Sequence, residues 1–295
     1  MRIKFEIDFE GFFRNKRNIY ASIIVFLLLV FVFIVFYIYF STPPSQNITV
    51  LDISSPDSVV TITENHVEPI IYTRIPDLQH LDIDERKDKF INIVLPAALI
   101  AQQIIKTKRE ELKTVKKKKV LTPQDSSLLD SILTKFNAKD IDDLISRLHS
   151  HPVSIIIAQA ATESGWGTSR FCREANNIFG VWSFNKNEQR IAAGKARDEK
   201  VIYLRKYDNL IGSIMDYLYT IAKSDAYKTF RQKRTISDNP YRLIWFLQNY
   251  SEKRLEYVIT LRDMLEHNDL SRYDSMTLPL ISEKDTTWQK LLEEY

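Results

Sequence analysis

The sequence is poor in the residues that build disulfide frameworks, metal sites and flexible chains. Its single cysteine, Cys172, excludes a disulfide within the chain, and no histidine lies near it in sequence to activate its thiol. The five histidines show no metal-ligand spacing, so we expect neither a metal nor another cofactor. His149 and His151 precede an apolar segment and are predicted to be surface residues. With only 6 glycines and 10 prolines, the chain is neither fibrous nor wholly disordered.

An excess of charge of either sign is also missing. The 41 lysines and arginines nearly balance the 38 acidic residues, which leaves a formal net charge of +3. A charge this small does not indicate a nucleic-acid partner, and we predict none. Hydrophobic residues make up 44% of the 295 positions, which is enough for one globular domain of moderate size in addition to a membrane segment.

Residues 20–40 contain no charged side chain and read YASIIVFLLLVFVFIVFYIYF. A helix needs about 20 apolar residues to cross the hydrocarbon core of a bilayer. A cleaved signal peptide would have a shorter apolar region that ends in small residues, whereas this one ends in Phe36-Tyr37-Ile38-Tyr39-Phe40. The segment therefore predicts an uncleaved transmembrane anchor over residues 19–41.

The basic residues on either side of this anchor predict its orientation. Residues 1–18 carry several lysines and arginines, and no further basic residue follows the anchor until Arg74. By the positive-inside rule, residues 1–18 form a cytoplasmic tail and the chain beyond residue 41 lies outside the cytoplasm.

The remainder of the chain predicts a mainly helical α+β fold. Residues 42–84 contain several prolines and are predicted to be a spacer with one or two short strands. A β-hairpin is expected from alternating residues, with strands at 186–193 and 199–207. Helices are predicted at residues 86–112, 125–148 (two short helices), 152–164, 209–223, 225–233, 239–248 and 253–267.

The predicted helix at 152–164 carries one carboxylate, Glu163, to its C-terminal end. Gly165, Trp166 and Gly167 then break the helix. The negative end of the helix dipole and an apolar neighbourhood that includes Trp166 both disfavour the ionised form of Glu163. A carboxyl group that stays protonated near neutral pH at the edge of a cleft is what a glycosidase needs as its general acid.

Two segments in this region also carry a family resemblance. They read AQAATESGWGTSRF at residues 158–171 and NNIFG at residues 176–180. The chain resembles the bacterial Bax-type N-acetylglucosaminidases of glycoside hydrolase family 73 over about residues 85–270. The resemblance implies a lysozyme-like domain at residues 85–275, followed by a C-terminal tail at 276–295. Such a domain would bind peptidoglycan glycan strands and cleave their N-acetylglucosaminyl linkages outside the bacterial inner membrane; the sequence does not identify a protein partner.

The resemblance also implies the catalytic groups. Glu163 matches the general acid of the family. For the second carboxylate, Glu188 is the best match on the predicted hairpin, with Asp198 and Glu199 as alternatives. A base at one of these positions would activate water for attack with inversion, at roughly 6.5–9.5 Å from Glu163. If none lies that close, the N-acetyl group of the substrate would assist instead.

The remaining predicted site residues are aromatic or lie at turns. Tyr250, in Asn249-Tyr250-Ser251, matches a family tyrosine that faces the cleaved sugar, and Tyr257 is expected to pack against the same helix. Trp166 and Phe179 are predicted to form the floor of the cleft, and Asn177 to set a turn. The predicted substrate-binding residues are therefore Trp166, Asn177, Phe179 and Tyr207.

Two other functions compete with a glucosaminidase. A lytic transglycosylase also uses a glutamate at a helix end followed by serine, but it continues into a GLMQ-like segment where this chain has NNIFGVW. A wall-binding scaffold that keeps the fold without catalysis is the second alternative, because the second carboxylate has no fixed position in the sequence.

Overall fold

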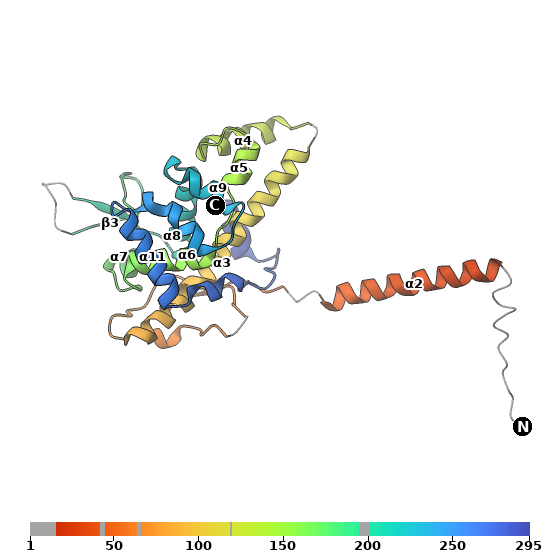
Figure 1. The fold of residues 1–295 in the computed structure, drawn as a ribbon, viewed down its shortest axis with the longest axis horizontal. Coiled ribbons are helices and arrows are strands. Elements are labelled where there is room, and N and C mark those ends of the chain that lie inside the picture. Colours follow the sequence, from red (N-terminus) through yellow and green to blue (C-terminus); the bar gives the residue numbers. More distant parts are fainter. Residues whose placement is uncertain (1–15, 42–44, 64–65, 119, 195–200) are drawn as a thin grey trace, which may run out of the picture. The chain divides into compact units, whose positions relative to one another are not determined.

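A computed structural model describes residues 16–41, 45–63, 66–118, 120–194 and 201–295 (Figure 1). The chain divides into two units, residues 1–45 and residues 46–295. The first unit contains helix α2 (Lys16–Ser41), and the second contains all the other described elements.

Helix α2 covers the whole uncharged segment of the sequence. Phe26, Phe31 and Phe33 are each more than half exposed, as are most of its other large apolar side chains. Of the described helices, α3 (Ile83–Lys117) is the one that is long and apolar enough to cross a membrane, but its most apolar stretch is mostly buried inside the second unit. Helix α3 is therefore the core helix of this unit, and the described apolar stretch of α2 is the shorter segment Ile19–Ile34.

The second unit is built around α3, which contacts α5, α6, α8 and α12. Helix α6 packs against α3 on one side and against α11 on another. Pro96 lies inside α3 and is buried in the core without ending the helix. The helices that follow α3 are α4 (Pro123–Lys135), α5 (Ile141–Arg147), α6 (Val153–Ser164), α7 (Arg170–Ala175), α8 (Leu210–Lys223), α9 (Lys228–Arg234), α10 (Pro240–Leu243), α11 (Leu255–His267) and α12 (Thr286–Glu294). Short 3₁₀ helices are η1 (Pro56–Ser58), η2 (Asp225–Tyr227), η3 (Ile244–Tyr250) and η4 (Leu270–Ser275).

Two small sheets complete the second unit. Strands β1 (Thr49–Leu51) and β2 (Ile70–Tyr72) pair in parallel. Strands β3 (Arg190–Ala192) and β4 (Tyr203–Arg205) form the antiparallel hairpin predicted from the sequence, although with shorter strands. The mainly helical character and the hairpin are thus confirmed. The hairpin tip, with Asp198 and Glu199, lies outside the described residues.

Residues 46–82, which we expected to act as a spacer, lie within the second unit. Ile48, Val67, Ile71 and Leu78 are all buried there, because short apolar runs between the prolines pack onto the helices. The C-terminal residues expected to form a tail are also part of this unit, since α12 packs on α3. The side chain of Asp285 caps α12 and also accepts a hydrogen bond from the backbone of Ile48.

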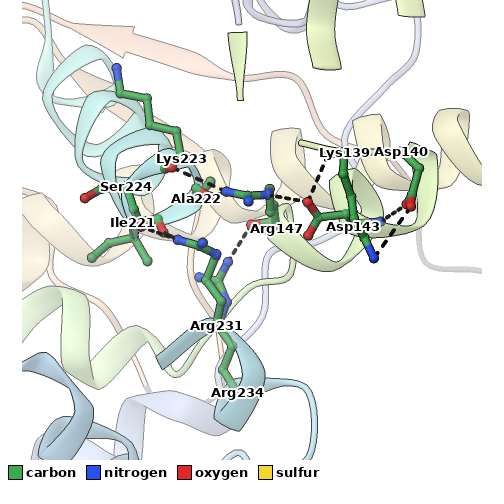
Figure 2. A network of polar contacts seen from close by, with 10 residues as sticks. All are labelled: Lys139, Asp140, Asp143, Arg147, Ile221, Ala222, Lys223, Ser224, Arg231 and Arg234. Atoms are coloured by element: carbon green, nitrogen blue, oxygen red, sulfur yellow. Dashed lines mark hydrogen bonds and ion pairs between the residues drawn. The ribbon is translucent and has the colours of Figure 1, made fainter. Parts of the chain in front are cut away.

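Three arginines hold the C-terminal ends of α8 and α5 (Figure 2). Arg147 donates to the carbonyls of Ala222 and Lys223, at 3.2 and 3.3 Å. Arg231 donates to the carbonyls of Ile221 and Ser224, and Arg234 donates to the carbonyl of Arg147 at 2.5 Å. The last carbonyls of a helix have no partner within it. Arg147 and Arg231 satisfy those at the end of α8, and Arg234 satisfies the one at the end of α5, so the three side chains link α8, α5 and α9.

Candidate active site

Helix α6 delivers Glu163 to the surface of the second unit. The helix ends at Gly165, which has φ +61° and ψ +47°, a left-handed conformation that costs glycine little. Gly167 has φ +79°, and a Cβ atom there would lie 3.0 Å from the ring of Phe90. Glycine is therefore required for the close approach of this loop to α3. The predicted helix and its termination at the Gly-Trp-Gly segment are confirmed.

The carboxyl group of Glu163 is open to solvent on one side and shielded by protein on the other. Burial raises its pKa above the usual range, and a hydrogen bond with the Tyr257 hydroxyl partly offsets this rise. Glu163 therefore keeps its proton to a higher pH than an exposed glutamate. The predicted direction of the pKa shift is confirmed.

Trp166, which we predicted to lie in the apolar neighbourhood of Glu163, packs on α3. The ring of Trp166 packs edge-on against Phe90 of α3, with ring centres 5.7 Å apart, and the Nζ atom of Lys87 lies 5.6 Å from its centre. Trp166 has φ +56°, so its backbone conformation differs from that of the helix before it. The described ring and cation contacts of Trp166 thus lie with α3.

Tyr250 and Tyr257 stack on each other, with ring centres 5.5 Å apart and planes at 11°. Tyr227 and Tyr217 pack around Tyr250 at 6.2 and 6.1 Å. Besides burial, the charge of Glu163 contributes to raising the pKa of Tyr227, Tyr250 and Tyr257, so all three lie within range of that charge. Tyr257, to which the sequence assigned only packing, thus belongs to the same cluster as Tyr250, whose role toward the substrate stays a prediction.

The NNIFG segment packs against this tyrosine cluster. Phe179 stacks on Tyr217 at 4.4 Å with planes at 13°, and is almost fully buried. The amide of Asn177 donates to the carbonyls of Val181 and Arg205 and accepts from the Val181 N–H. Asn177 thus sets the turn that leads into the hairpin, as predicted. Both protons of its amide are used within the protein, so its influence on a substrate would be indirect.

Glu188 belongs to a different group of side chains. It lies just before β3, accepts a hydrogen bond from the Ser183 hydroxyl at 2.7 Å, and forms an ion pair with the Nε of Arg205 at 3.3 Å. Arg205 also pairs with Asp216 at 2.7 Å, and the Tyr207 hydroxyl donates to the same carboxylate at 2.6 Å. Glu188 and Tyr207 therefore line one open pocket, and their described polar contacts do not reach Glu163.

Two further sequence predictions concern buried groups. Cys172 is completely buried, and burial raises the pKa of its thiol, so it is unsuited to nucleophilic chemistry. The prediction that His151 is a surface residue is wrong, because its ring is buried between Tyr217 and Phe230, with ring centres at 5.9 and 5.2 Å. Its position before Pro152 resembled a loop in the sequence, and only the packing of α8 and α9 reveals the burial.

Comparisons with known proteins place this site in a recognised domain. Residues 138–270 match the glucosaminidase family model, described as mannosyl-glycoprotein endo-beta-N-acetylglucosaminidase. The chain is 26% identical to protein Bax of Escherichia coli (strain K12) over 169 residues, which cover 54% of this chain and 60% of Bax. It is also 26% identical to the exo-glucosaminidase LytG of Bacillus subtilis (strain 168) over 147 residues, 47% of this chain and 51% of LytG. The chain thus spans about half to three fifths of the length of these relatives.

Solved structures with similarity include two hydrolase domains. The catalytic domain of the autolysin Auto from Listeria monocytogenes has a TM-score of 0.36 and 20% identity, covering 57% of this chain and 97% of that domain. The glycoside hydrolase domain of FlgJ from Salmonella typhimurium has a TM-score of 0.34 and 21% identity, covering 57% and 99%.

The matched region contains Glu163, Glu188, Tyr250 and Tyr257, together with α5 to α11. Residues 138–270 therefore match a family model of glycosidase-type enzymes. More particularly, the chain is similar to protein Bax and to LytG over about half of its length.

Proposed function

We propose that this chain is a membrane-anchored peptidoglycan hydrolase that cleaves N-acetylglucosaminyl bonds in the bacterial cell wall, with Glu163 as the general acid. The observation that supports the proposal is the pKa of Glu163, which burial raises at the open end of α6 inside the matched region. A general acid must hold its proton at working pH and release it to the oxygen of the departing sugar.

Tyr250 would act at the same centre. Its ring packs against Tyr257 and Tyr227, and burial raises the pKa of its hydroxyl well above the usual range, with a further contribution from the charge of Glu163. The hydroxyl therefore stays protonated and is able to donate a hydrogen bond to the substrate or to charge that develops in the transition state. The aromatic faces of this cluster would also suit the apolar face of a sugar ring.

For the second carboxylate, we infer that Glu188 is the general base. Ser183 and Arg205 hold its carboxylate in one orientation at the base of the hairpin, as positioning of an attacking water requires. Such a base acts with inversion of the anomeric carbon. Asp198 and Glu199 on the hairpin, and assistance by the N-acetyl group of the substrate, are the alternatives.

Replacing Glu188 by glutamine should reduce turnover by about 10², the low end for loss of an acid–base group, without weakening binding to peptidoglycan. Turnover and binding are measured on purified sacculi, and azide should partly restore turnover of Glu188→Ala. The matched control is Glu174→Gln, which removes an exposed carboxylate paired with Arg170 and should change activity little. If Glu188→Gln behaves like this control, the base is one of the alternatives.

Helix α2 would provide the membrane anchor. It is apolar all round, and its large side chains are exposed, which suits a helix surrounded by lipid. Basic residues precede it and are sparse after it, so residues 1–18 would be cytoplasmic and the glucosaminidase domain would face the periplasm or wall. The proposed location is the bacterial inner membrane, with a single pass.

The products of the reaction test the proposed activity. The full chain is incubated with purified peptidoglycan, and the soluble fragments are analysed by mass spectrometry. We expect fragments that end in free reducing N-acetylglucosamine. Anhydro-muramyl ends would show a lytic transglycosylase instead, and binding to sacculi without release of fragments would show a scaffold.

A further inference from the structure

A chain of hydrogen-bonded side chains crosses the core from α9 to Glu163. Arg234 Nη1 lies 3.2 Å from His151 Nδ1, and His151 Nε2 lies 3.1 Å from the Tyr217 hydroxyl. The Tyr217 hydroxyl lies 2.6 Å from Gln159 Oε1, and Gln159 Nε2 lies 3.0 Å from the Tyr257 hydroxyl. Tyr257 in turn is coupled to Glu163, since each of the two side chains shifts the pKa of the other. In the same order, the first five residues come from α9, the segment just before α6, α8, α6 itself and α11.

All five members are buried, and none is more than 4% exposed. A buried polar group that lacks a hydrogen-bond partner is costly, and bulk water cannot replace a partner at these positions. Each member of the chain therefore depends on the next, and the network transmits the proton arrangement at one end to the other.

Arg234 fixes that arrangement because a guanidinium group donates hydrogen bonds and accepts none. Burial lowers the pKa of Arg234 to about 9, so the side chain is still a cationic donor at neutral pH. Its neighbour His151 Nδ1 must then be the acceptor. Burial, followed by the charges of Arg234 and His149, lowers the pKa of His151 well below its usual range, so His151 is neutral and carries its single proton on Nε2.

The remaining donors follow in order. The Nε2–H of His151 donates to the Tyr217 oxygen, so the Tyr217 proton is directed to Gln159 Oε1. This interaction turns the amide nitrogen of Gln159 toward Tyr257, where it donates to the hydroxyl oxygen. The proton of Tyr257 is thereby left for Glu163. Every bond in the chain points from the buried arginine toward the carboxyl group.

We propose that Arg234 orders this chain so that Tyr257 always donates to Glu163, and that Gln159, Tyr217 and His151 are positioning residues for the general acid. The donated hydrogen bond occupies one carboxyl oxygen, so the acidic proton is held on the other. The inference deepens the proposed function, since it rests on Glu163 acting as the acid. Besides Tyr257, the groups whose pKa responds to the charge of Glu163 are Tyr227 and Tyr250.

The test compares single hydroxyl deletions in the full chain. Glutamate carboxyl carbons are labelled with 13C, the signal of Glu163 is identified with Glu163→Gln, and its pKa is measured by NMR without substrate. Tyr257→Phe should make Glu163 an about tenfold weaker acid, because a hydrogen bond to a charged group stabilises the ionised form by roughly that factor. Tyr217→Phe should act in the same direction with a smaller effect, because the freed Gln159 amide is then able to turn its oxygen toward Tyr257.

The matched control is Tyr219→Phe on the same helix. The Tyr219 hydroxyl donates to the backbone carbonyl of Tyr295, which is not part of the hydrogen-bond network. Loss of this hydroxyl should therefore leave the Glu163 pKa unchanged. In Tyr257→Phe and in Tyr217→Phe, the basic limb of the kcat/KM profile should move to higher pH. If Tyr217→Phe changes thermal stability like the control and leaves the Glu163 pKa at the wild-type value, the hydrogen-bond network has only a structural role and the inference is wrong.

A measurement on the wild-type protein tests the donor-to-acceptor direction of the hydrogen-bond network independently. With 15N-labelled histidine, His151 should show the neutral tautomer protonated at Nε2 throughout neutral pH. The Nδ1-protonated tautomer would reverse the order of the chain and overturn the inference. Failure of the proposed function is distinguishable, because it would appear as retained activity in Glu163→Gln while these NMR results stay as expected.

Discussion

Glu163→Gln is expected to lower the rate of glycosidic bond cleavage by about 10²–10⁴, the usual effect of losing a general acid. Glutamine has nearly the same shape, and its amide oxygen is still able to accept from Tyr257, but it has no acidic proton for the departing oxygen. Since Glu163 opens to solvent at the last turn of α6, the fold should be retained. The rate is measured as release of soluble fragments from peptidoglycan, with circular dichroism to verify folding.

The control for this substitution is Glu256→Gln on α11. Glu256 is exposed and pairs with Lys253 at 3.1 Å, so its loss should leave the rate nearly unchanged. More than about a tenth of wild-type activity in Glu163→Gln would contradict the assignment, because a rate loss below tenfold is too small for a missing general acid.

The raised pKa of Glu163 also predicts the pH dependence of the wild-type enzyme. The protonated form is the active one, so kcat/KM should fall as pH rises through this pKa. The folded state binds the proton more tightly than the unfolded state, so this group stabilises the fold at low pH and loses that contribution as pH rises. Glu163→Gln should lack this contribution to the pH dependence of stability.

The parts of the site that the sequence predicted depend on local patterns. The apolar run before Glu163 and the glycines after it specify a helix and its end from neighbouring residues alone. The alternation around Tyr203 and Arg205 likewise specified a strand, and its partner strand was predicted correctly. These features need no knowledge of how distant elements pack.

The parts that the sequence missed depend on packing between distant segments. Gln159 meets Tyr217 and Tyr257 only because α8 and α11 both pack near α6, across 58 and 98 positions of sequence. His151 is buried for the same reason. Trp166 follows Glu163 closely in sequence, yet its ring contacts α3, because the left-handed turn changes the course of the chain between the two residues.

Burial of the segment before α3 was missed for a related reason. Ile48, Ile71 and Leu78 stand in short apolar runs separated by prolines, a pattern that fits a spacer as well as a packed layer. Their burial follows from contacts of β2 with α3 and α8. Sequence periodicity does not distinguish the two cases, because none of these runs is long enough to define a buried face.

Two arginines placed in α2, as Leu28→Arg with Phe31→Arg, are expected to remove the chain from the membrane. Both positions lie near the middle of the predicted span at residues 19–41, and both side chains are exposed on the helix. An arginine at the centre of a transmembrane helix costs about 2.5–3.5 kcal/mol on insertion scales. Two would together cost about 5–7 kcal/mol, which corresponds to a loss of more than about 10³ in the insertion equilibrium.

The measurement is the fraction of the chain that remains in membranes after washing with alkaline carbonate, followed by protease treatment of spheroplasts. In the wild type, the chain should stay in the membrane fraction, and added protease should digest residues beyond 41. The matched control, Leu28→Ile with Phe31→Leu, keeps the helix apolar and should behave like the wild type. If the arginine variant stays in washed membranes, or if the wild-type domain is protected from protease in intact spheroplasts, α2 does not anchor the domain outside the cytoplasm. A soluble arginine variant beside a membrane-bound control would tie localisation to the apolar surface of α2, independently of Glu163 and its chemistry.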